Sequence, residues 1–346
     1  MAAGMRRNLT GLLRRAAGTT GLGERLDALR GEMLGRIEAL RADLARQAPP
    51  PAPAPAAPGL EVLPANAYAR YALPMEYPPS RDLRPRWGYT HPLIGPLAEW
   101  MGRHDEDYRA VLRGMRDAAP ILRRINLDFD HARLPEPGWR GTPYAPFDAA
   151  VLHAMIGRHR PRLYLEIGSG STTAVARRAA RDHGLATRIV SIDPEPRAAI
   201  DALCDEVIRA GLETCDLAVF DRLQPGDVLF LDGSHRVFMN SDVTVFMLDV
   251  LPRLAPGVVV HVHDIHLPWD YPDMFTPWYW SEAYILAAWI MAAPDRVRPL
   301  MPTAWVCRAP QFADWFAAGP LVDLGAENEG WRGGGALWFT RLAAQG

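Results

Sequence analysis

From Phe147 to the end of the chain, short apolar segments alternate with longer segments of helical pattern, and this alternation is the strongest constraint on the fold. The clearest apolar segments are Asp-Val-Leu-Phe-Leu at 227–231 and Val-Val-Val-His-Val at 258–262. Strands that are apolar throughout are buried on both faces, and strands separated by helices usually run parallel. The pattern therefore predicts an α/β domain whose sheet is covered by helices on both faces.

Seven strands and six helices are expected in this domain. The strands are predicted at 162–167, 188–192, 206–209, 227–231, 258–262, 297–300 and 336–340, and the helices at 147–158, 172–181, 196–203, 216–223, 242–254 and 282–292. We expect a mostly parallel seven-stranded sheet over residues 147–346, preceded by an N-terminal extension of helix and coil.

That extension divides into three segments. In residues 1–48, apolar residues recur at spacings of three or four, as on one face of an amphipathic helix; they are Leu22, Leu26, Leu29, Met33, Ile37, Leu40 and Leu44. Residues 49–58 are Pro and Ala only and predict an extended linker. A helix held away by such a linker needs a partner for its apolar face, so we expect homo-oligomerisation, with a flexible appendage as the alternative. Residues 59–146, rich in Pro, Arg and aromatic residues, are expected to form a cap or leader on the main domain.

The composition limits both the chemistry and the partners. All 38 basic residues are arginine, which excludes a Schiff-base lysine, a phosphate-loop lysine and a lysine general base. Arginine stays protonated, so acid–base chemistry must fall to His, Asp, Glu, Tyr or Cys. The net charge of −2 favours neither nucleic acid nor an anionic membrane surface. Three cysteines without metal-binding spacing, and no apolar run of transmembrane or secretory-signal type, lead us to expect a cytoplasmic protein without stable membrane insertion.

A glycine turn joins the first predicted strand of the domain to the next helix. Its glycines permit a tight turn and close approach of a ligand, and the helix N-terminus favours a carboxylate or phosphate. Asp193 ends the next strand, 23 residues after Gly170, where an acidic residue accepts hydrogen bonds from ribose hydroxyls in nucleotide-binding units. The candidate cofactor-binding residues are Glu166, Gly168, Ser169, Gly170, Thr172 and Asp193, together with Asp232.

The turn also separates two classes of ligand. A dinucleotide-binding loop has a third glycine where the helix crosses the pyrophosphate, and here that position is Thr173. With neither that glycine nor a lysine, a pyrophosphate is a poor fit. A ligand with a ribose, an amino-acid carboxylate and an ammonium group fits better, and S-adenosylmethionine has these parts.

Four motifs in order resemble those of class I S-adenosylmethionine-dependent methyltransferases. They are Glu-Ile-Gly-Ser-Gly at 166–170, Ser-Ile-Asp-Pro-Glu-Pro-Arg at 191–197, Asp-Gly-Ser-His at 232–235 and His-Asp-Ile at 263–265. The similarity covers roughly Phe147 to Arg341 and is greatest to the small-molecule O-methyltransferases that include the macrolide-sugar enzymes. It implies a Rossmann-like fold, S-adenosylmethionine as the cofactor and a hydroxyl-bearing small molecule as the substrate.

Asp232 and Asp264 follow neighbouring predicted strands, so both carboxylates should reach one crevice. Adjacent carboxylates repel unless a proton or cation lies between them, and Mg²⁺ suits oxygen ligands. The resemblance implies that Asp232 and Asp264 hold the metal and that His235 is the general base. In a chain without lysine, His235 is also the best-placed base. His263 stands where some relatives have another acidic ligand.

Further candidates surround this cluster. His266 is a second candidate base, whereas His261 is expected to be a packing residue. The loop that follows Asp264 contains several aromatic residues with Asp270 and Glu282, which would suit a sugar or another polyhydroxylated ring, or else form a hydrophobic lid or dimer surface. In the leader, the residues that could line a substrate mouth, with ordinary packing as the alternative, are Arg84, Arg86, Trp87 and Tyr89.

The sequence thus predicts transfer of a methyl group from S-adenosylmethionine to a hydroxyl of a small molecule. One alternative is an NAD- or nucleotide-dependent enzyme on the same fold. Another is a non-catalytic cofactor-binding scaffold whose N-terminal helix assembles partners. The acceptor stays open among sugar, polyketide, lipid-headgroup and catechol-like hydroxyls.

Overall fold

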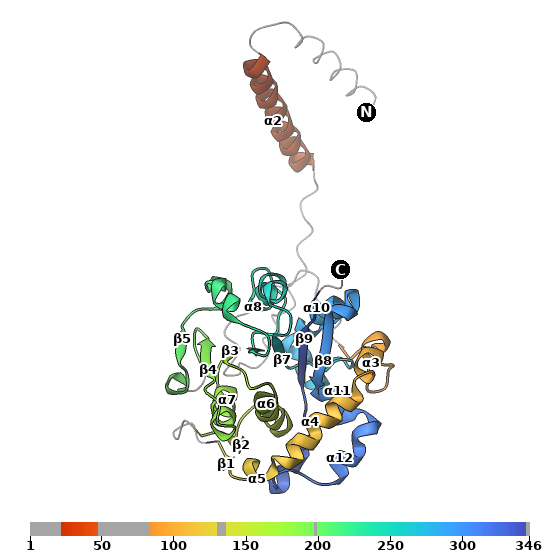
Figure 1. Ribbon diagram of the computed structural model, residues 1–346. Coiled ribbons are helices and arrows are strands. Elements are labelled where there is room, and N and C mark those ends of the chain that lie inside the picture. The colour runs from red at the N-terminus through yellow and green to blue at the C-terminus, as the bar shows by residue number, and fades with distance from the viewer. Residues whose placement is uncertain (1–21, 48–82, 130–135, 197–198, 344–346) are drawn as a thin grey trace. The chain divides into compact units, whose positions relative to one another are not determined.

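The computed structural model describes residues 22–47, 83–129, 136–196 and 199–343 (Figure 1). The chain divides into two compact units, Met1–Pro78 and Pro79–Gly346. The described part of the first unit is one helix, α2 (Leu22–Gln47). The linker predicted at 49–58 and the leader before residue 83 lie outside the described residues. Across the described ranges, no helix has the length and hydropathy needed to cross a bilayer.

The second unit contains a seven-stranded sheet of order β5-β4-β3-β6-β7-β9-β8. Its strands are β3 (Leu163–Ile167), β4 (Arg188–Ile192), β5 (Glu206–Ile208), β6 (Val228–Leu231), β7 (Val259–His263), β8 (Val297–Pro302) and β9 (Ala336–Arg341). The first five strands pair in parallel, and β9 is antiparallel to both β7 and β8. The prediction of a mostly parallel seven-stranded, Rossmann-like sheet is confirmed.

The strand order determines where a ligand-binding site can form at the edge of the sheet. β4 pairs on one side of β3 and β6 on the other, so the chain changes direction across the sheet at β3. Ile167, the last residue of β3, pairs with Ile192 of β4 and Leu231 of β6. The residues that follow these three strands therefore emerge together at one edge, which is where open α/β sheets bind ligands.

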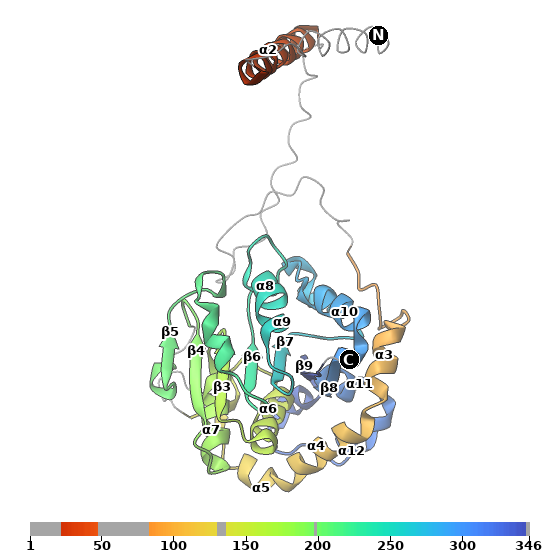
Figure 2. The same cartoon turned by 45° about the horizontal axis from the view of Figure 1, so that its top comes forward.

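Two hydrophobic clusters fill the opposite faces of the sheet. Alternate residues of one strand enter different clusters: Tyr164 faces the first, and Leu163 and Leu165 face the second. The first cluster lies under α4 (Asp105–Asp117), α6 (Pro146–His159) and α7 (Ser171–Asp182); the second lies under α3 (Gly95–Gly102), α8 (Asp242–Val245) and α10 (Glu282–Ala292) (Figure 2). Further elements include α5 (Ala119–Leu122), β1 (Asn126–Asp128), β2 (Gly138–Arg140), η2 (Leu212–Thr214), η6 (Pro294–Arg296), α11 (Thr303–Arg308), η7 (Pro310–Phe312), α12 (Ala313–Ala317) and η8 (Gly325–Arg332).

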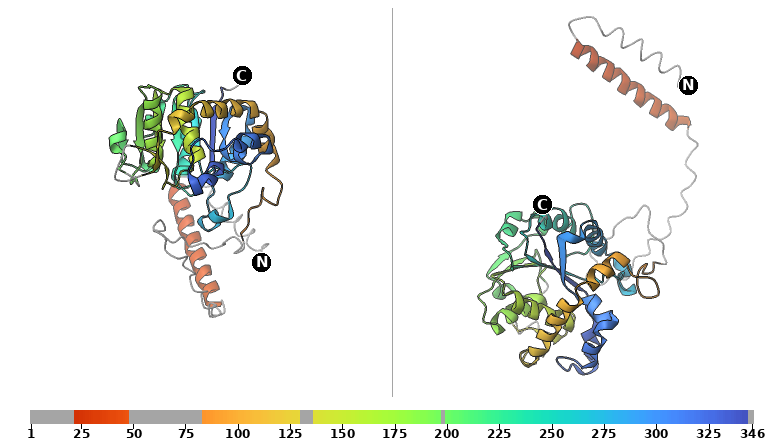
Figure 3. Two further views of the ribbon diagram at one scale, coloured as in Figure 1. Left: turned by 90° about the horizontal axis from the view of Figure 1, so that it is seen from below. Right: turned by 45° about the vertical axis from the view of Figure 1, so that its right-hand side comes forward.

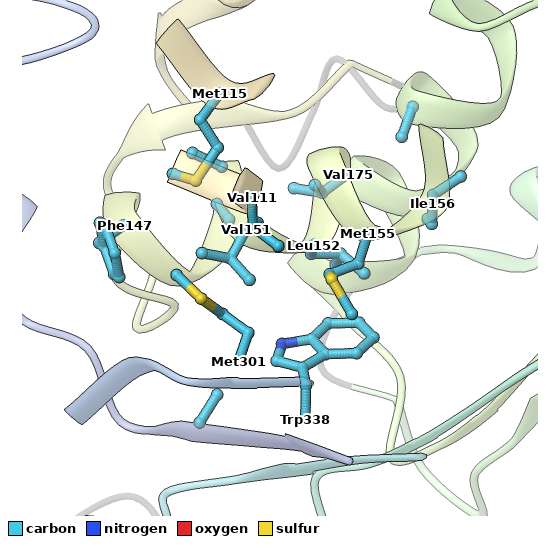
Figure 4. Close-up of a cluster of buried hydrophobic side chains, with 14 of the residues drawn as sticks. Val111, Met115, Phe147, Val151, Leu152, Met155, Ile156, Val175, Met301 and Trp338 are labelled. Atoms are coloured by element: carbon cyan, nitrogen blue, oxygen red, sulfur yellow. The ribbon is translucent and has the colours of Figure 1, made fainter. Parts of the chain in front are cut away.

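The centre of the first cluster is Trp338 of β9, which is fully buried (Figure 4). Leu152 and Met155 of α6 lie above its ring, and Met301 of β8 lies beside it (Figure 4). Met115 of the leader helix α4 belongs to the same cluster. The leader residues from α3 onward therefore fold with the sheet, and α3 and α4 lie against the C-terminal part of the unit in both views of Figure 3.

Three predicted helices differ from the structure. Among the described residues of the helix expected at 196–203, only one short turn forms, η1 (Asp201–Leu203). The helix at 216–223 is the tight turn η3 (Leu217–Arg222), capped by the Asp216 carboxylate. The helix at 242–254 contains a wide π turn, η4 (Phe246–Val250), before α9 (Leu251–Arg253). Pro252 lacks the N–H that a regular helix would need there.

The burial of a residue in the sheet core predicts how much its side chain contributes to the free energy of unfolding. Leu229, in the central strand β6, is fully buried, whereas Leu248 is 66% exposed. Leu229→Ala should lower the free energy of unfolding by about 2–5 kcal/mol, and Leu248→Ala should change it by less than about 0.5 kcal/mol. Urea denaturation of both variants measures the difference, and equal effects would contradict the described burial.

Candidate active site

Gly168 follows β3 and sits against the backbone of Asp232. Its φ of +77° is in the left-handed region, and an added Cβ would collide with the carbonyl oxygen of Asp232. The Gly168 N–H donates to Ile192 at 3.0 Å, and the Asp232 N–H donates to Ile167 at 2.9 Å. Both the backbone angle and the available space thus require glycine, and the predicted cofactor turn is directly joined to the predicted catalytic strand end.

Asp193 links the glycine turn to the end of β4. Its Oδ2 accepts the Ser169 N–H at 2.7 Å, and its Oδ1 accepts the Glu195 N–H at 2.8 Å. The Ser169 hydroxyl meets that of Ser191 at 2.7 Å. A carboxylate oxygen has a second lone pair, so Asp193 can hold the turn and also accept hydroxyl groups.

Glu166, a predicted cofactor-binding residue, supports the turn from inside. Its fully buried carboxylate accepts hydrogen bonds from Tyr164 at 3.1 Å, from Thr172 at 2.5 Å and from Thr173. Burial raises the pKa of Glu166 to about 7, although these hydroxyl donors lower it. The Thr172 hydroxyl is occupied in the same network, whereas Gly170 caps α7 and donates its N–H to Thr173 at 3.2 Å.

The predicted catalytic residues converge at the neighbouring strand ends. His235 Nε2 lies 3.4 Å from an oxygen of Asp232 and 3.4 Å from an oxygen of Asp264. One ligand atom from each of these three residues lies within 4.8 Å of the others. His235 and Asp264 have φ values of +61° and +53°, a conformation that costs energy in residues other than glycine and often occurs at functional sites.

His235 is fixed from behind by Glu282, a partnership that the sequence did not reveal. Its Nδ1 lies 3.0 Å from the buried Glu282 carboxylate at the start of α10, and the Ser281 and Glu282 N–H groups donate to its carbonyl. Burial lowers the pKa of His235, but hydrogen bonds to Asp232 and Glu282 and the charge of Asp264 raise it to about 10. Glu282 lies 47 residues away in sequence, so no local motif signals this contact.

The other histidines have different surroundings. His263 Nδ1 lies 3.6 Å from Asp232 and 3.4 Å from Asp264; burial lowers its pKa, but these two charges raise it well above its ordinary value. His261 stacks on Phe230 at 3.8 Å between ring centres, in agreement with a packing role. His266 is buried beside Arg308, and burial together with that cation lowers its pKa to about 3.

The imidazole rings of His235 and His263 each contact both carboxylates, Asp232 and Asp264. Burial raises the pKa of Asp232, but the positive charge of His263 and the hydrogen bond from His235 hold it well below its ordinary value. Burial likewise raises the pKa of Asp264, but the positive charge of His263 and its hydrogen bond bring that pKa below its ordinary value. Carboxylate oxygens and imidazole nitrogens are common ligands of divalent cations in proteins, and both kinds of ligand lie together here.

The aromatic loop after β7 covers one side of the cluster. Trp280 lies 4.3 Å from the His235 ring and stacks with Phe275 of η5 (Asp273–Trp278) at 4.5 Å. Asp270 does not point freely outward: its carboxylate accepts the Arg86 N–H at 2.8 Å and the Tyr284 hydroxyl at 2.5 Å. It therefore fastens the leader to the loop. Leader residues 83–87 and 91–93, which include Arg84, Arg86 and Trp87, line an open groove of about 720 Å³.

Residues 165–265 match the family model of a methyltransferase domain. Among solved structures, a methyltransferase from Podospora anserina, PaMTH1, bound to SAH, is 14% identical over 57% of this chain and 78% of that one, with a TM-score of 0.34. A structure named cmcI-N160 SAH is 18% identical over 39% of this chain and 69% of that one, with a TM-score of 0.26. No curated protein sequence matches the chain. The matched stretch runs from the glycine turn to the Asp264 strand end, so both parts of the site lie in a region that is similar to a methyltransferase domain.

The buried Glu166 carboxyl predicts a specific dependence of stability on pH. Its pKa of about 7 in the folded protein exceeds the ordinary value of 4.5, so the native state holds a proton that the unfolded state releases between these values. The stabilisation is complete below about pH 4.5 and is lost as the pH rises through about 7. Between pH 4.5 and pH 8, the free energy of unfolding of the wild type should fall by on the order of 3 kcal/mol more than that of Glu166→Gln.

Urea denaturation at several pH values measures this difference. Asp249→Asn, at an exposed position on η4, is the matched control and should keep the wild-type pH dependence. Parallel pH profiles for wild type and Glu166→Gln would contradict the assignment.

Proposed function

We propose that the protein transfers the methyl group of S-adenosylmethionine to a hydroxyl of a small molecule, with His235 as the general base. The observation that carries the proposal is the direct contact between the two halves of the site. Gly168, at the centre of the cofactor turn, touches the backbone of Asp232, whose side chain belongs to the Asp232–His235–Asp264 cluster. A methyl donor held over the turn would therefore lie beside that cluster.

The cofactor residues would act in different ways. Asp193 would accept the ribose hydroxyls, and the backbone at Gly168 and Gly170 would let the cofactor approach the main chain. Glu166 and Thr172 would keep the first turn of α7 in place, because their side chains bond to each other within the protein. Asp232 would also lie near the methionine part.

Asp232 and Asp264 fit a divalent cation, Mg²⁺ in our proposal. One oxygen of each carboxylate and a nitrogen of the nearby His235 lie within 4.8 Å of one another, so a single cation could contact all three. When bound there, the cation would lower the pKa of an acceptor hydroxyl and offset the carboxylate charge that keeps a proton on His235.

The reaction then needs one proton transfer and one methyl transfer. Glu282 accepts the Nδ1–H of neutral His235, which leaves the Nε2 lone pair directed toward Asp232 and Asp264. Nε2 takes the proton of the acceptor hydroxyl. The oxygen forms a bond to the methyl carbon, and the carbon–sulfur bond breaks with its electron pair left on sulfur as S-adenosylhomocysteine. The protein contributes alignment, deprotonation and exclusion of water.

The aromatic loop supports a ring-shaped acceptor. Phe275 and Trp280 present a stacked pair beside His235, and rings of this kind stack on the apolar faces of sugars and other polyhydroxylated rings. Asp270 and Glu282 are engaged inside the protein, so acceptor hydroxyls would meet the Asp232–Asp264 side of the site instead.

Cofactor identity is tested by thermal stabilisation. A ligand that binds only the folded state raises the melting temperature, so S-adenosylhomocysteine at 100 times its Kd should stabilise by about 2.7 kcal/mol, and NAD should have no effect. Asp193→Asn should weaken the shift, and the exposed Asp249→Asn should preserve it. No shift with saturating S-adenosylhomocysteine, or a shift with NAD, would contradict the proposal.

The role of His235 is tested with an acceptor found by screening hydroxyl compounds against methyl-labelled S-adenosylmethionine. His235→Ala should lower kcat by about 10²–10⁴-fold and leave S-adenosylhomocysteine binding unchanged. His104→Ala, at the junction of α3 and α4, is the control. Retained turnover in His235→Ala would show that His235 is not the general base. Turnover that survives exhaustive chelation would show that the reaction needs no divalent cation.

A further inference from the structure

Helix α2 exposes a row of large apolar side chains. Among its described side chains, Met33 is 54% exposed, Ile37 43% and Leu40 60%. A helix of 26 residues in water gains most of its stability from burial of such a face. A contiguous exposed row therefore indicates a surface that binds another molecule.

The sequence of α2 repeats every eleven residues. Residues 22–32 read LGERLDALRGE and residues 33–43 read MLGRIEALRAD. Apolar residues occupy the first, fifth and eighth positions of each copy, and Leu44 begins a third. Eleven residues make three helical turns, so these positions form one continuous seam of the kind found in right-handed supercoiled helices.

This seam reads the same in both directions. Its spacings are four, three, four, four, three and four, with Met33 at the centre. In an antiparallel pair centred there, Met33 would lie opposite the partner's Met33, and Leu29 opposite the partner's Ile37. Every apolar layer is then matched in a single register, as a two-fold symmetric interface requires.

The charges beside the seam favour the same orientation. Arg36 and Glu32 form an ion pair of 3.7 Å on one flank of α2. In the antiparallel register each would also lie near the opposite charge on the second helix. In a parallel pair this flank would meet the other flank of the second helix, and Arg36 would lie opposite the partner's Arg41. Flanking residues of like charge disfavour such a pairing.

We propose that α2 binds α2 of a second copy of this chain in an antiparallel pair centred on Met33, which makes the protein a homodimer. The helix contains five acidic and five basic residues, so its neutral balance suits its own copy better than an anionic membrane. The two linkers would leave opposite ends of a helix pair about 39 Å long.

Light scattering of the full chain tests the interface. Wild type should be a dimer at micromolar concentration, and Leu40→Glu should raise the dimer dissociation constant by at least about 100-fold because it buries a charge. Ala39→Glu adds the same charge one residue away, off the seam, and should remain dimeric. A monomeric wild type, or a dimer unaffected by Leu40→Glu, would overturn the proposal.

Disulfide cross-linking tests the orientation. In a background with Cys204→Ser and Cys215→Ser, Met33→Cys should form a cross-linked dimer. Leu26→Cys mixed with Leu40→Cys should form a mixed disulfide, and neither should cross-link alone. Cross-linking of Leu26→Cys alone would indicate a parallel pair and contradict the model. Binding of the wild-type chain to phosphatidylserine vesicles as a monomer would show a lipid surface as the occupant instead.

Discussion

The contact between the Gly168 backbone and the Asp232 carbonyl is the constraint on which the site depends. Two strands that are far apart in sequence, β3 and β6, pair so that their last residues are level. The chain leaving β3 must then turn against the chain leaving β6, and only a residue without a side chain fits there. One steric requirement thus brings a cofactor turn and a catalytic strand end together without a connecting loop.

The second organising feature is a partly buried group of charges in near balance. Asp232 and Asp264 face His235 and His263, and Glu282 binds the far side of His235. No single pair accounts for the arrangement, because Asp232 and Asp264 each contact both imidazoles, and His235 contacts Glu282 as well. The charge state of any one group therefore depends on a cation or substrate that enters the cluster.

The sheet could be predicted from the sequence because its strands are apolar on both faces and lie between helical segments. The meeting of Asp232 and Asp264 was also predictable, since the carboxyl ends of parallel strands share an edge. The partners of the Glu166 side chain could not be predicted, because a position at the end of a strand does not tell which face the residue occupies; the structure puts its carboxylate among threonine hydroxyls. The His235–Glu282 and Arg86–Asp270 contacts join distant segments, and nothing in either local sequence encodes them.

The position of β9 has a consequence for how the sheet is completed during synthesis. β9 follows β8 in sequence, yet it lies between β7 and β8 in the interior of the sheet. While the protein emerges from the ribosome, the edge of β7 stays unpaired until β9 has been synthesised. A polypeptide that ends before β9 would lack an internal strand rather than an edge strand, and it would expose a surface suited to aggregation or to capture by chaperones.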